Sequence, residues 1–139
     1  MMRRGPKISI FVYVLVSSWS LPGWAADIPW KIDEPAAQRL AAEANGPDFD
    51  VGLFNYGPGM SPPFFVFEGL NDPPREGSFG YFAVNPWTGD VWNLWGCHKM
   101  STPALRKSQA EIRKRFTADE LKHYAELRRL KPECIVETP

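Results

Sequence analysis

The sequence predicts a single α+β domain, on the strength of its length and of two contrasting patterns along the chain. The chain has 139 residues, the size of one compact domain. Helix signals occur at both ends of the part after residue 25, while residues 48–96 hold short aromatic runs separated by Gly and Pro. The hydrophobic content is 44%, which is normal for a globular chain. Together these features exclude a multidomain enzyme, a helical repeat array, a polytopic membrane protein and a wholly disordered chain.

Residues 1–25 have the anatomy of a secretory signal peptide. Three basic residues and no acidic ones precede an apolar run at residues 8–16, ISIFVYVLV, and small residues follow. Cleavage after Ala25 places Gly23 at position −3, whereas cleavage one residue later would place the bulky Trp24 there. We therefore expect residues 1–25 to be removed and residues 26–139 to form the mature domain.

A transmembrane anchor is the alternative interpretation of the same segment. A membrane-spanning helix needs about 20 apolar residues, and serines at 17, 18 and 20 interrupt this run. We therefore expect a periplasmic or secreted protein without a stable membrane anchor.

Removal of residues 1–25 changes the charge of the chain. The whole sequence is neutral, with 16 basic and 16 acidic residues, but three of the bases lie in the leader. Residues 26–96 then carry 10 acids and 3 bases, whereas residues 97–139 carry 6 acids and 10 bases. Such asymmetry can steer partners of either sign to different faces; a helix surface rich in solvated Lys and Arg is the alternative for the second half.

Cys97 and Cys134 are the only cysteines of the chain. In an exported protein, an even pair predicts a disulfide. A bond closing a loop of this length stabilises a domain by about 4 kcal/mol in the chain-entropy model. A reactive Cys97 thiol beside His98 is the alternative, and it would require Cys134 to stay unpaired.

An N-terminal helix is predicted that begins near Pro35 and runs to the stop signal Asn45-Gly46-Pro47. Asp33 and Glu34 precede Pro35, an Ala-rich stretch follows, and Asn45-Gly46-Pro47 ends it, as helix start and stop signals do. Alanines and one leucine recur on one stripe and predict a buried face: Ala36, Ala37, Leu40, Ala41 and Ala44.

Four strands of an antiparallel meander are predicted between residues 49 and 95. Aromatic and β-branched residues suit a pleated surface, and Gly and Pro suit the breaks between strands. The hairpin of residues 79–84 and 91–95 is the best supported, because Asn85-Pro86 suits a type I turn and Gly89 suits a left-handed position. Phe79, Tyr81 and Ala83 should share one face, and Phe82 and Val84 the other. The four runs are residues 49–56, 64–69, 78–85 and 90–95.

Two C-terminal helices are predicted after the strands. Ser101-Thr102-Pro103 can open the first, with Leu105, Ile112 and Phe116 on one stripe. Thr117 and Glu120 form a capping box for the second, which Pro132 stops and which should bury Leu121, Tyr124, Leu127 and Leu130. The predicted disulfide would then hold these helices against the edge of the sheet.

The segment FAVNPWTGDVW at residues 82–92 consists of an apolar strand, a turn ending in Thr-Gly-Asp and a second apolar strand. In this respect it resembles small exported cystatin-like domains, including the PepSY type, over about a dozen residues. The additional C-terminal helices and the disulfide depart from that pattern. The resemblance implies binding or inhibition in the cell envelope, without catalysis.

Catalytic and metal-binding motifs find little support in the sequence. The cysteines could join His98 and His123 in a metal set, but the adjacent Cys97-His98 is a poor chelating pair, since zinc ligands usually lie two to four residues apart. The acids at predicted strand ends could serve a hydrolase, the third-ranked function, but solvated carboxylates are the common case: Asp48, Asp50, Glu68, Asp72, Glu76 and Asp90. We expect no catalytic residue, metal or cofactor. We also expect no nucleic-acid partner, because the aromatic residues lie away from the basic run Arg113-Lys114-Arg115.

Aromatic residues and Met on Pro-bounded loops favour a protein-binding function. Trp87 lies at a hairpin tip, where we expect it to be exposed; folding back onto its own hairpin is the alternative. Loops 57–63, 71–77 and 85–89 form the expected site, whose contact residues are Tyr56, Met60, Arg75, Glu76, Trp87 and Asp90. The sequence thus predicts an exported protein that binds a protein partner, as an inhibitor or immunity-type factor for an envelope or cell-wall enzyme. The alternative is a small-ligand or envelope-sensing module with a pocket between sheet and helices.

Overall fold

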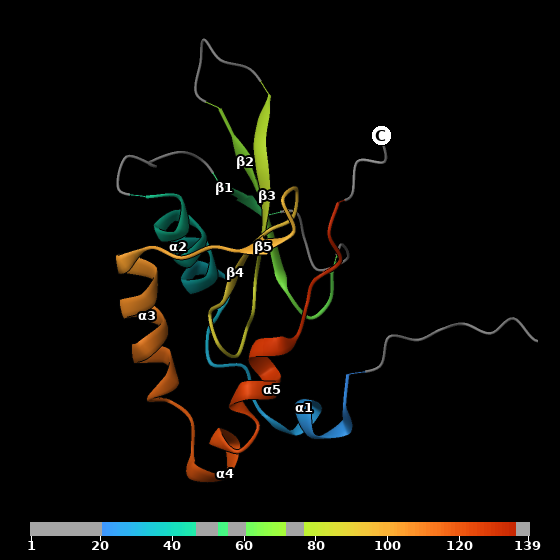
Figure 1. Ribbon diagram of the computed structural model, residues 1–139, viewed down its shortest axis with the longest axis vertical. Coiled ribbons are helices and arrows are strands. Elements are labelled where there is room, and N and C mark those ends of the chain that lie inside the picture. Colours follow the sequence, from blue (N-terminus) through green and yellow to red (C-terminus); the bar gives the residue numbers. More distant parts are fainter. Residues whose placement is uncertain (1–20, 47–52, 56–60, 72–76, 136–139) are drawn as a thin grey trace, which may run out of the picture.

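The computed structural model describes residues 21–46, 53–55, 61–71 and 77–135. Within them the chain forms two helices, a β-sheet and three further helices (Figure 1). The elements are α1 (Gly23–Asp27), α2 (Glu34–Asn45), β1 (Leu53–Asn55), β2 (Phe65–Leu70), β3 (Ser78–Val84), β4 (Val91–Asn93), β5 (His98–Lys99), α3 (Pro103–Arg113), α4 (Ala118–Leu121) and α5 (Tyr124–Arg129). The predicted α+β class is confirmed.

The sheet is an antiparallel meander in the order β1-β2-β3-β4-β5. The predicted hairpin is confirmed, with Ala83 opposite Trp92 and Val84 opposite Val91. The predicted fourth strand is shorter than expected, because the chain turns after Asn93. That turn also creates the short strand β5, which the sequence did not predict and which pairs with β4.

Helix α2 begins and ends where the sequence predicts. The Asp33 side chain accepts a hydrogen bond from the Ala36 backbone N–H at 2.9 Å, which satisfies one of the free donors of the first turn. Gly46 follows the last residue with φ of 97°, a conformation that favours glycine. The small residues of its predicted stripe bring the helix close to the sheet, and all but Ala36 are buried.

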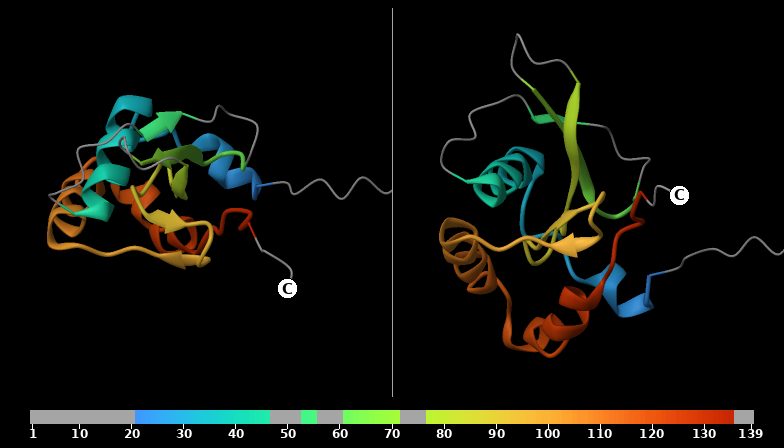
Figure 2. Two further views of the ribbon diagram at one scale, coloured as in Figure 1. Left: turned by 90° about the horizontal axis from the view of Figure 1, so that it is seen from above. Right: turned by 45° about the horizontal axis from the view of Figure 1, so that its top comes forward.

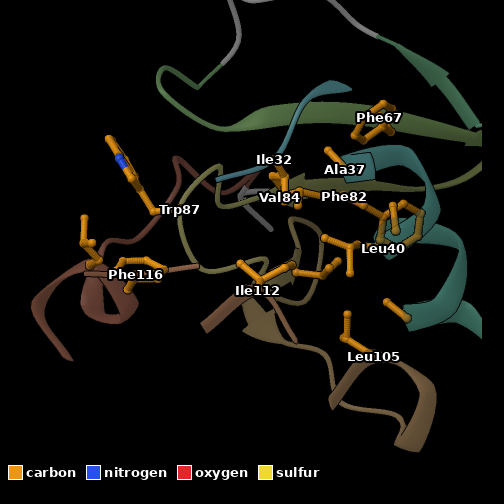
Figure 3. Close-up of a cluster of buried hydrophobic side chains, with 14 of the residues drawn as sticks. Ile32, Ala37, Leu40, Phe67, Phe82, Val84, Trp87, Leu105, Ile112 and Phe116 are labelled. Carbon is orange, nitrogen blue, oxygen red and sulfur yellow. The ribbon is translucent and has the colours of Figure 1, made fainter. Parts of the chain in front are cut away.

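The main core lies between one face of the sheet and the helices (Figure 3). Figures 1 and 2 show α2 and α3 side by side on one flank, and α4 and α5 at the end where α1 also lies. The sheet contributes Phe67, Phe82 and Val84, and the helices contribute Leu40, Leu105, Ile112 and Leu127. These side chains pack together in one cluster of buried residues.

Phe79 packs on the face of Phe82, and not with Tyr81 and Ala83 as the alternation predicts. The strand register shifts between Gly69 and Leu70, and this bulge breaks the alternation of side chains. The Phe79 ring occupies the space that a Cβ on Gly69 would fill, and its centroid lies 5.8 Å from that of Phe82.

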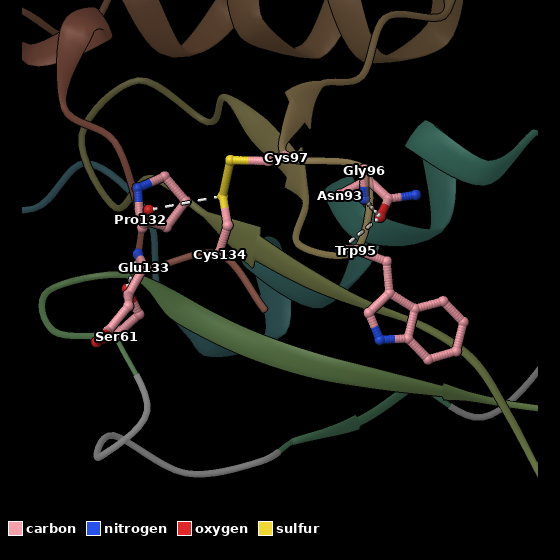
Figure 4. The surroundings of a disulfide bond; sticks show 8 residues. All are labelled: Ser61, Asn93, Trp95, Gly96, Cys97, Pro132, Glu133 and Cys134. Atoms are coloured by element: carbon pink, nitrogen blue, oxygen red, sulfur yellow. Dashed lines mark hydrogen bonds between the residues drawn. A yellow bond between two sulfur atoms is a disulfide. The ribbon is translucent and has the colours of Figure 1, made fainter. Parts of the chain in front are cut away.

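The other face of the sheet carries a second cluster, formed by Phe64, Val66, Ala83 and Leu94. Residues 131–135, here called the C-terminal strap, run along this face, where the Ile135 N–H donates to the Leu94 carbonyl at 3.0 Å. The predicted disulfide is confirmed: Cys97 and Cys134 are bonded, with their Cα atoms 5.5 Å apart. It fastens the strap to the sheet (Figure 4).

The last predicted helix is divided into α4 and α5. The capping box of Thr117 and Glu120 is confirmed at the start of α4, but the helix breaks at Lys122 and His123. Leu127 is fully buried, whereas Leu121 is 36% exposed. The prediction that Leu121 shares the buried stripe is therefore wrong, because the break ends the helical periodicity that would align the two leucines.

Helix α1 crosses the predicted boundary between leader and mature domain. The bond between Ala25 and Ala26 lies inside this helix, and Ala25 is fully buried. Among the described helices, none has both the length and the apolar character needed to cross a membrane.

Candidate protein-binding surface

Four of the six predicted contact residues lie outside the described part of the chain: Tyr56, Met60, Arg75 and Glu76. The other two, Trp87 and Asp90, lie in and after the β3–β4 turn, and both are buried, with 2% and 3% of their surface exposed. The structure therefore does not bring these two to the surface.

The expectation that Trp87 is exposed is wrong. Its Nε1–H donates to the Ile28 carbonyl at 2.7 Å, because the segment after α1 runs across the turn. The predicted left-handed position of Gly89 is confirmed, with φ of 74°. In the same turn, Asn85 Oδ1 accepts from the Trp87 and Thr88 N–H groups. Trp87 is thus a core residue that joins the turn to the N-terminal segment.

Asp90 holds the same turn to the C-terminal helices. Its carboxylate accepts from the Thr88 hydroxyl at 2.8 Å and from the Arg128 guanidinium at 3.2 and 3.3 Å. Lys99 lies 3.6 Å away. The hydrogen bond to Asp90 raises the pKa of Arg128. Because basic side chains already neutralise the charge of this buried carboxylate, its role is structural.

Trp95, unlike Trp87, is an exposed aromatic residue on a turn between two strands. It lies in the β4–β5 turn and is 44% exposed. Asn93 Oδ1 accepts from the Trp95 N–H at 3.0 Å and from the Gly96 N–H at 3.1 Å, and Cys97, next in the chain, is fixed by the disulfide. Figure 4 shows the indole pointing away from the disulfide. A side chain on such a braced turn loses little freedom when it binds.

Tyr81 lies beside Trp95, and Glu68 lies beside Tyr81; we call these three residues the Trp95 patch. The Tyr81 and Trp95 rings meet edge to face, with centroids 5.9 Å apart. Tyr81 donates its hydroxyl to Glu68 Oε1 at 3.2 Å, and the two residues are opposite each other on β3 and β2. The patch therefore combines an exposed indole, a phenol ring and a carboxylate on neighbouring strands.

Trp95 is not among the predicted contact residues, because the fourth predicted strand, residues 90–95, includes it. The sequence Asn93-Leu94-Trp95-Gly96 does contain a signal, since Asn side chains accept hydrogen bonds from backbone N–H groups two residues on and favour turns, as Gly does. With that signal, the turn could have been placed before Cys97.

Two surface hollows lie elsewhere on the molecule. One, of about 370 Å³, lies between α2 and α3, where Arg39, Lys107 and Arg115 surround the apolar Leu40 and Ile112. The other, of about 410 Å³, lies between Ser61-Pro62 and the strap residues Lys131, Pro132 and Glu133.

The histidines do not assemble a metal site in the described residues. His98 is exposed on β5, and His123 stacks on Trp24. Within the described ranges, no group of three or more His, Cys, Asp and Glu side chains is arranged to hold a metal ion. Asp90, which is buried, already forms ion pairs with Arg128 and Lys99.

Comparisons with known proteins leave the function open. No protein-family model matches the chain, and no curated protein matches it. Among solved structures, the chain is similar to one in the structure of a type VI secretion system effector–immunity complex from Pseudomonas protegens. The similarity has 23% sequence identity and a TM-score of 0.49, and it covers 69% of this chain and 88% of that one. The disulfide favours a location outside the cytoplasm.

Proposed function

We propose that this chain is an exported protein that binds another protein through the Trp95 patch. The observation that carries the proposal is the exposure of Trp95 on a turn held by Asn93 and the disulfide. Tryptophan and tyrosine are enriched among the residues that dominate binding energy. A large aromatic side chain that the core does not use, on a rigid support, is the arrangement such residues need.

The chemistry of the patch suits a basic side chain of the partner. Indole and phenol faces attract Lys and Arg cations, and Glu68 adds a carboxylate next to Tyr81. Contact between a partner's Lys or Arg, the Trp95 ring and Glu68 would combine cation–π attraction with a charge-assisted hydrogen bond. The excess of acidic residues in the first half of the mature chain, 10 acids against 3 bases in residues 26–96, also favours a basic target.

The finer proposal is that the partner is an envelope or cell-wall enzyme and that binding inhibits it. The leader-like segment and the disulfide support an encounter outside the cytoplasm. Trp95 lies in the turn of the β4–β5 hairpin, and its exposed indole is small enough to enter a substrate cleft. Inhibition would then result from steric block of that cleft.

A pull-down with the oxidised, exported chain tests the proposal. The bait is incubated with envelope and secreted extracts at low salt, and bound proteins are identified by mass spectrometry. We expect the parent chain to capture a stoichiometric partner. The Trp95→Ala variant should bind that partner with at least tenfold lower affinity. Trp30→Ala is the matched control, because Trp30 is 54% exposed and packs edge to face on Phe65, on the opposite face of the sheet.

The outcomes separate the coarse proposal from the fine one. If Trp95→Ala and Trp30→Ala lose partner binding equally, or if both retain it, the role of the Trp95 patch is overturned. Absence of any partner would overturn the binding function in these extracts. If the captured partner is an enzyme, its activity is measured with and without the chain; full activity in the complex would overturn inhibition and leave binding intact.

A further inference from the structure

The hollow of about 370 Å³ between α2 and α3 has an apolar floor. The two helices lie side by side (Figure 2), and the floor is formed by the buried Leu40 of α2 and Ile112 of α3 (Figure 3). Both side chains pack against the β3–β4 turn, because a Cβ added to Gly89 would lie 2.7 Å from Ile112 Cδ1 and 3.1 Å from Leu40 Cδ1. The floor is therefore an apolar surface that the turn supports.

Hydrogen bonds join the two sides of the hollow at both ends. At one end, the Thr102 hydroxyl donates to the Glu43 carbonyl at 2.8 Å. At the other, Arg115 Nη1 donates to the Lys31 carbonyl, just before α2, at 2.7 Å. The residues that line the space between these ends include three small ones: Ala36, Ala104 and Ser108. The hollow is thus formed without a ligand, as most small-molecule sites are.

Basic side chains surround the apolar floor. Arg39 of α2 and Lys107 of α3 line the hollow and are exposed. Within the part of the chain that the structure describes, neither side chain forms an ion pair or a hydrogen bond. Arg115 is a third basic residue of the lining. Cations without partners beside an apolar surface attract a negatively charged ligand.

Two acidic residues of the lining do not cancel this charge. Glu111 pairs with Lys114, whose Nζ lies 2.8 Å from Glu111 Oε1, and this hydrogen bond is the main cause that holds the pKa of Glu111 below its ordinary value of 4.5. Glu43 lies at the end near Thr102, and its Oε2 atom is buried. With Lys114 included, four basic residues face two acidic ones. The excess charge around the hollow is therefore positive.

The volume of the hollow limits the size of a ligand. At about 30 Å³ for each water-sized group, the space has room for roughly a dozen non-hydrogen atoms. Pockets for small molecules begin near about 300 Å³ and are often found between helices. A molecule of this size that carries one anionic group on an apolar chain matches both the floor and the charged rim.

We infer that the α2–α3 hollow binds a small amphipathic anion, namely a carboxylate on an apolar chain of about ten carbons. The chain lies on Leu40 and Ile112, and Arg39 and Lys107 bind the carboxylate through charge-assisted hydrogen bonds. The hollow shares no residue with the Trp95 patch, so this inference does not depend on a protein partner.

Titration with decanoate tests the inference. The full chain is produced with isotopic labels in a bacterium that exports it, and the oxidised protein is titrated below the micelle concentration of the probe. Calorimetry measures the affinity, and NMR locates the amide groups whose signals shift. We expect saturable binding, with the shifts centred on α2 and α3. Acetate has the charge without the chain, and decyltrimethylammonium has the chain with the opposite charge; each should bind at least tenfold more weakly.

Matched variants distinguish the hollow from general surface charge. Arg39→Gln combined with Lys107→Gln removes two cations of the lining, and we expect at least tenfold weaker binding of decanoate. Arg106→Gln combined with Lys122→Gln removes two exposed cations that do not line the hollow, and should leave the affinity within about twofold of the parent. Equal effects of the two double variants would overturn the inference.

A third variant tests the shape of the hollow. Ala36→Leu extends an apolar side chain from the lining, and we expect at least tenfold weaker binding in a domain whose thermal melt shows it to be folded. Trp95→Ala should bind decanoate as the parent does. The inference is overturned if decanoate does not bind at millimolar concentration, if decyltrimethylammonium binds equally well, if Ala36→Leu binds unchanged, or if Trp95→Ala abolishes binding.

Discussion

Asp90 and Arg128 form an ion pair between the β3–β4 turn and α5, with the Asp90 Oδ1 atom 3.2 Å from Arg128 Nη2. The two residues are 38 positions apart in the sequence. The Asp90 side chain is 4% exposed and the Arg128 side chain 48% exposed. The pair, with Asn85 donating its amide to the Leu127 carbonyl, holds α5 against the turn.

Arg128→Ala tests the structural role of this ion pair. It leaves the buried Asp90 carboxylate with Thr88 and the more distant Lys99, and we expect the free energy of unfolding to fall by about 1–3 kcal/mol, measured by urea denaturation. Lys114→Ala removes an exposed pair with Glu111 and should cost less than about 1 kcal/mol. Equal effects of the two variants would contradict a structural role for the buried pair.

Trp87 and Trp95 should respond to mutation in opposite ways. Trp87→Phe replaces the buried indole with a smaller ring that cannot donate to the Ile28 carbonyl, and we expect a loss of about 2–4 kcal/mol in the free energy of unfolding. Trp95→Ala should leave the melting temperature within a few degrees of the parent and weaken partner binding. Thermal melts of the two variants check this; a larger loss in Trp95→Ala would show that Trp95 belongs to the packing.

The disulfide should support both stability and binding. Its two cysteines are 37 positions apart, and the double variant Cys97→Ser, Cys134→Ser should lower the free energy of unfolding by about 2–4 kcal/mol. The variant also frees the Trp95 turn from the strap, so we expect weaker partner binding at a temperature where the domain is still folded. Circular dichroism establishes that temperature, and unchanged affinity there would show that Asn93 alone fixes the turn.

Glu120 should contribute to stability in mildly acidic and neutral solution. Hydrogen bonds from Lys31 and the Thr117 N–H hold the pKa of Glu120 below its ordinary value of 4.5. Because the folded-state pKa is the lower one, the contribution is present above pH 4.5 and is lost as the pH falls through the folded-state value. Unfolding measured across acidic pH should show this loss in the parent, and a smaller dependence in Glu120→Gln. Identical pH profiles would contradict the assignment.

Much of the fold could be predicted because the relevant interactions are local. Asp33 caps α2 through a residue three positions away, and the Thr117–Glu120 box spans the same distance. The hairpin register follows from Asn85 and Gly89, four residues apart. The failures occur where a local irregularity changes the period: the bulge at Gly69 moves Phe79, and the break at His123 separates Leu121 from Leu127.

The binding surface was harder to predict, because exposure depends on what covers a residue. Trp87 and Trp95 both follow strands and both lie in turns that an Asn side chain holds. Segment 28–32 crosses the first turn, where Trp87 is buried, whereas Trp95 in the second turn is 44% exposed. No local pattern distinguishes the two tryptophans, so the sequence could indicate aromatic binding residues without selecting the correct one.

The sequence by itself determined the α+β class, the meander, the start of α2, the capping box and the pairing of Cys97 with Cys134. The helix and strand features depend on residues a few positions apart in the sequence. The disulfide could be assigned because the chain has two cysteines. Only the tertiary structure decided that Trp87 is buried under Ile28, 59 positions earlier, and that Trp95 is exposed. Packing between distant segments sets which surface reaches solvent, and this is why the candidate site came from the structure.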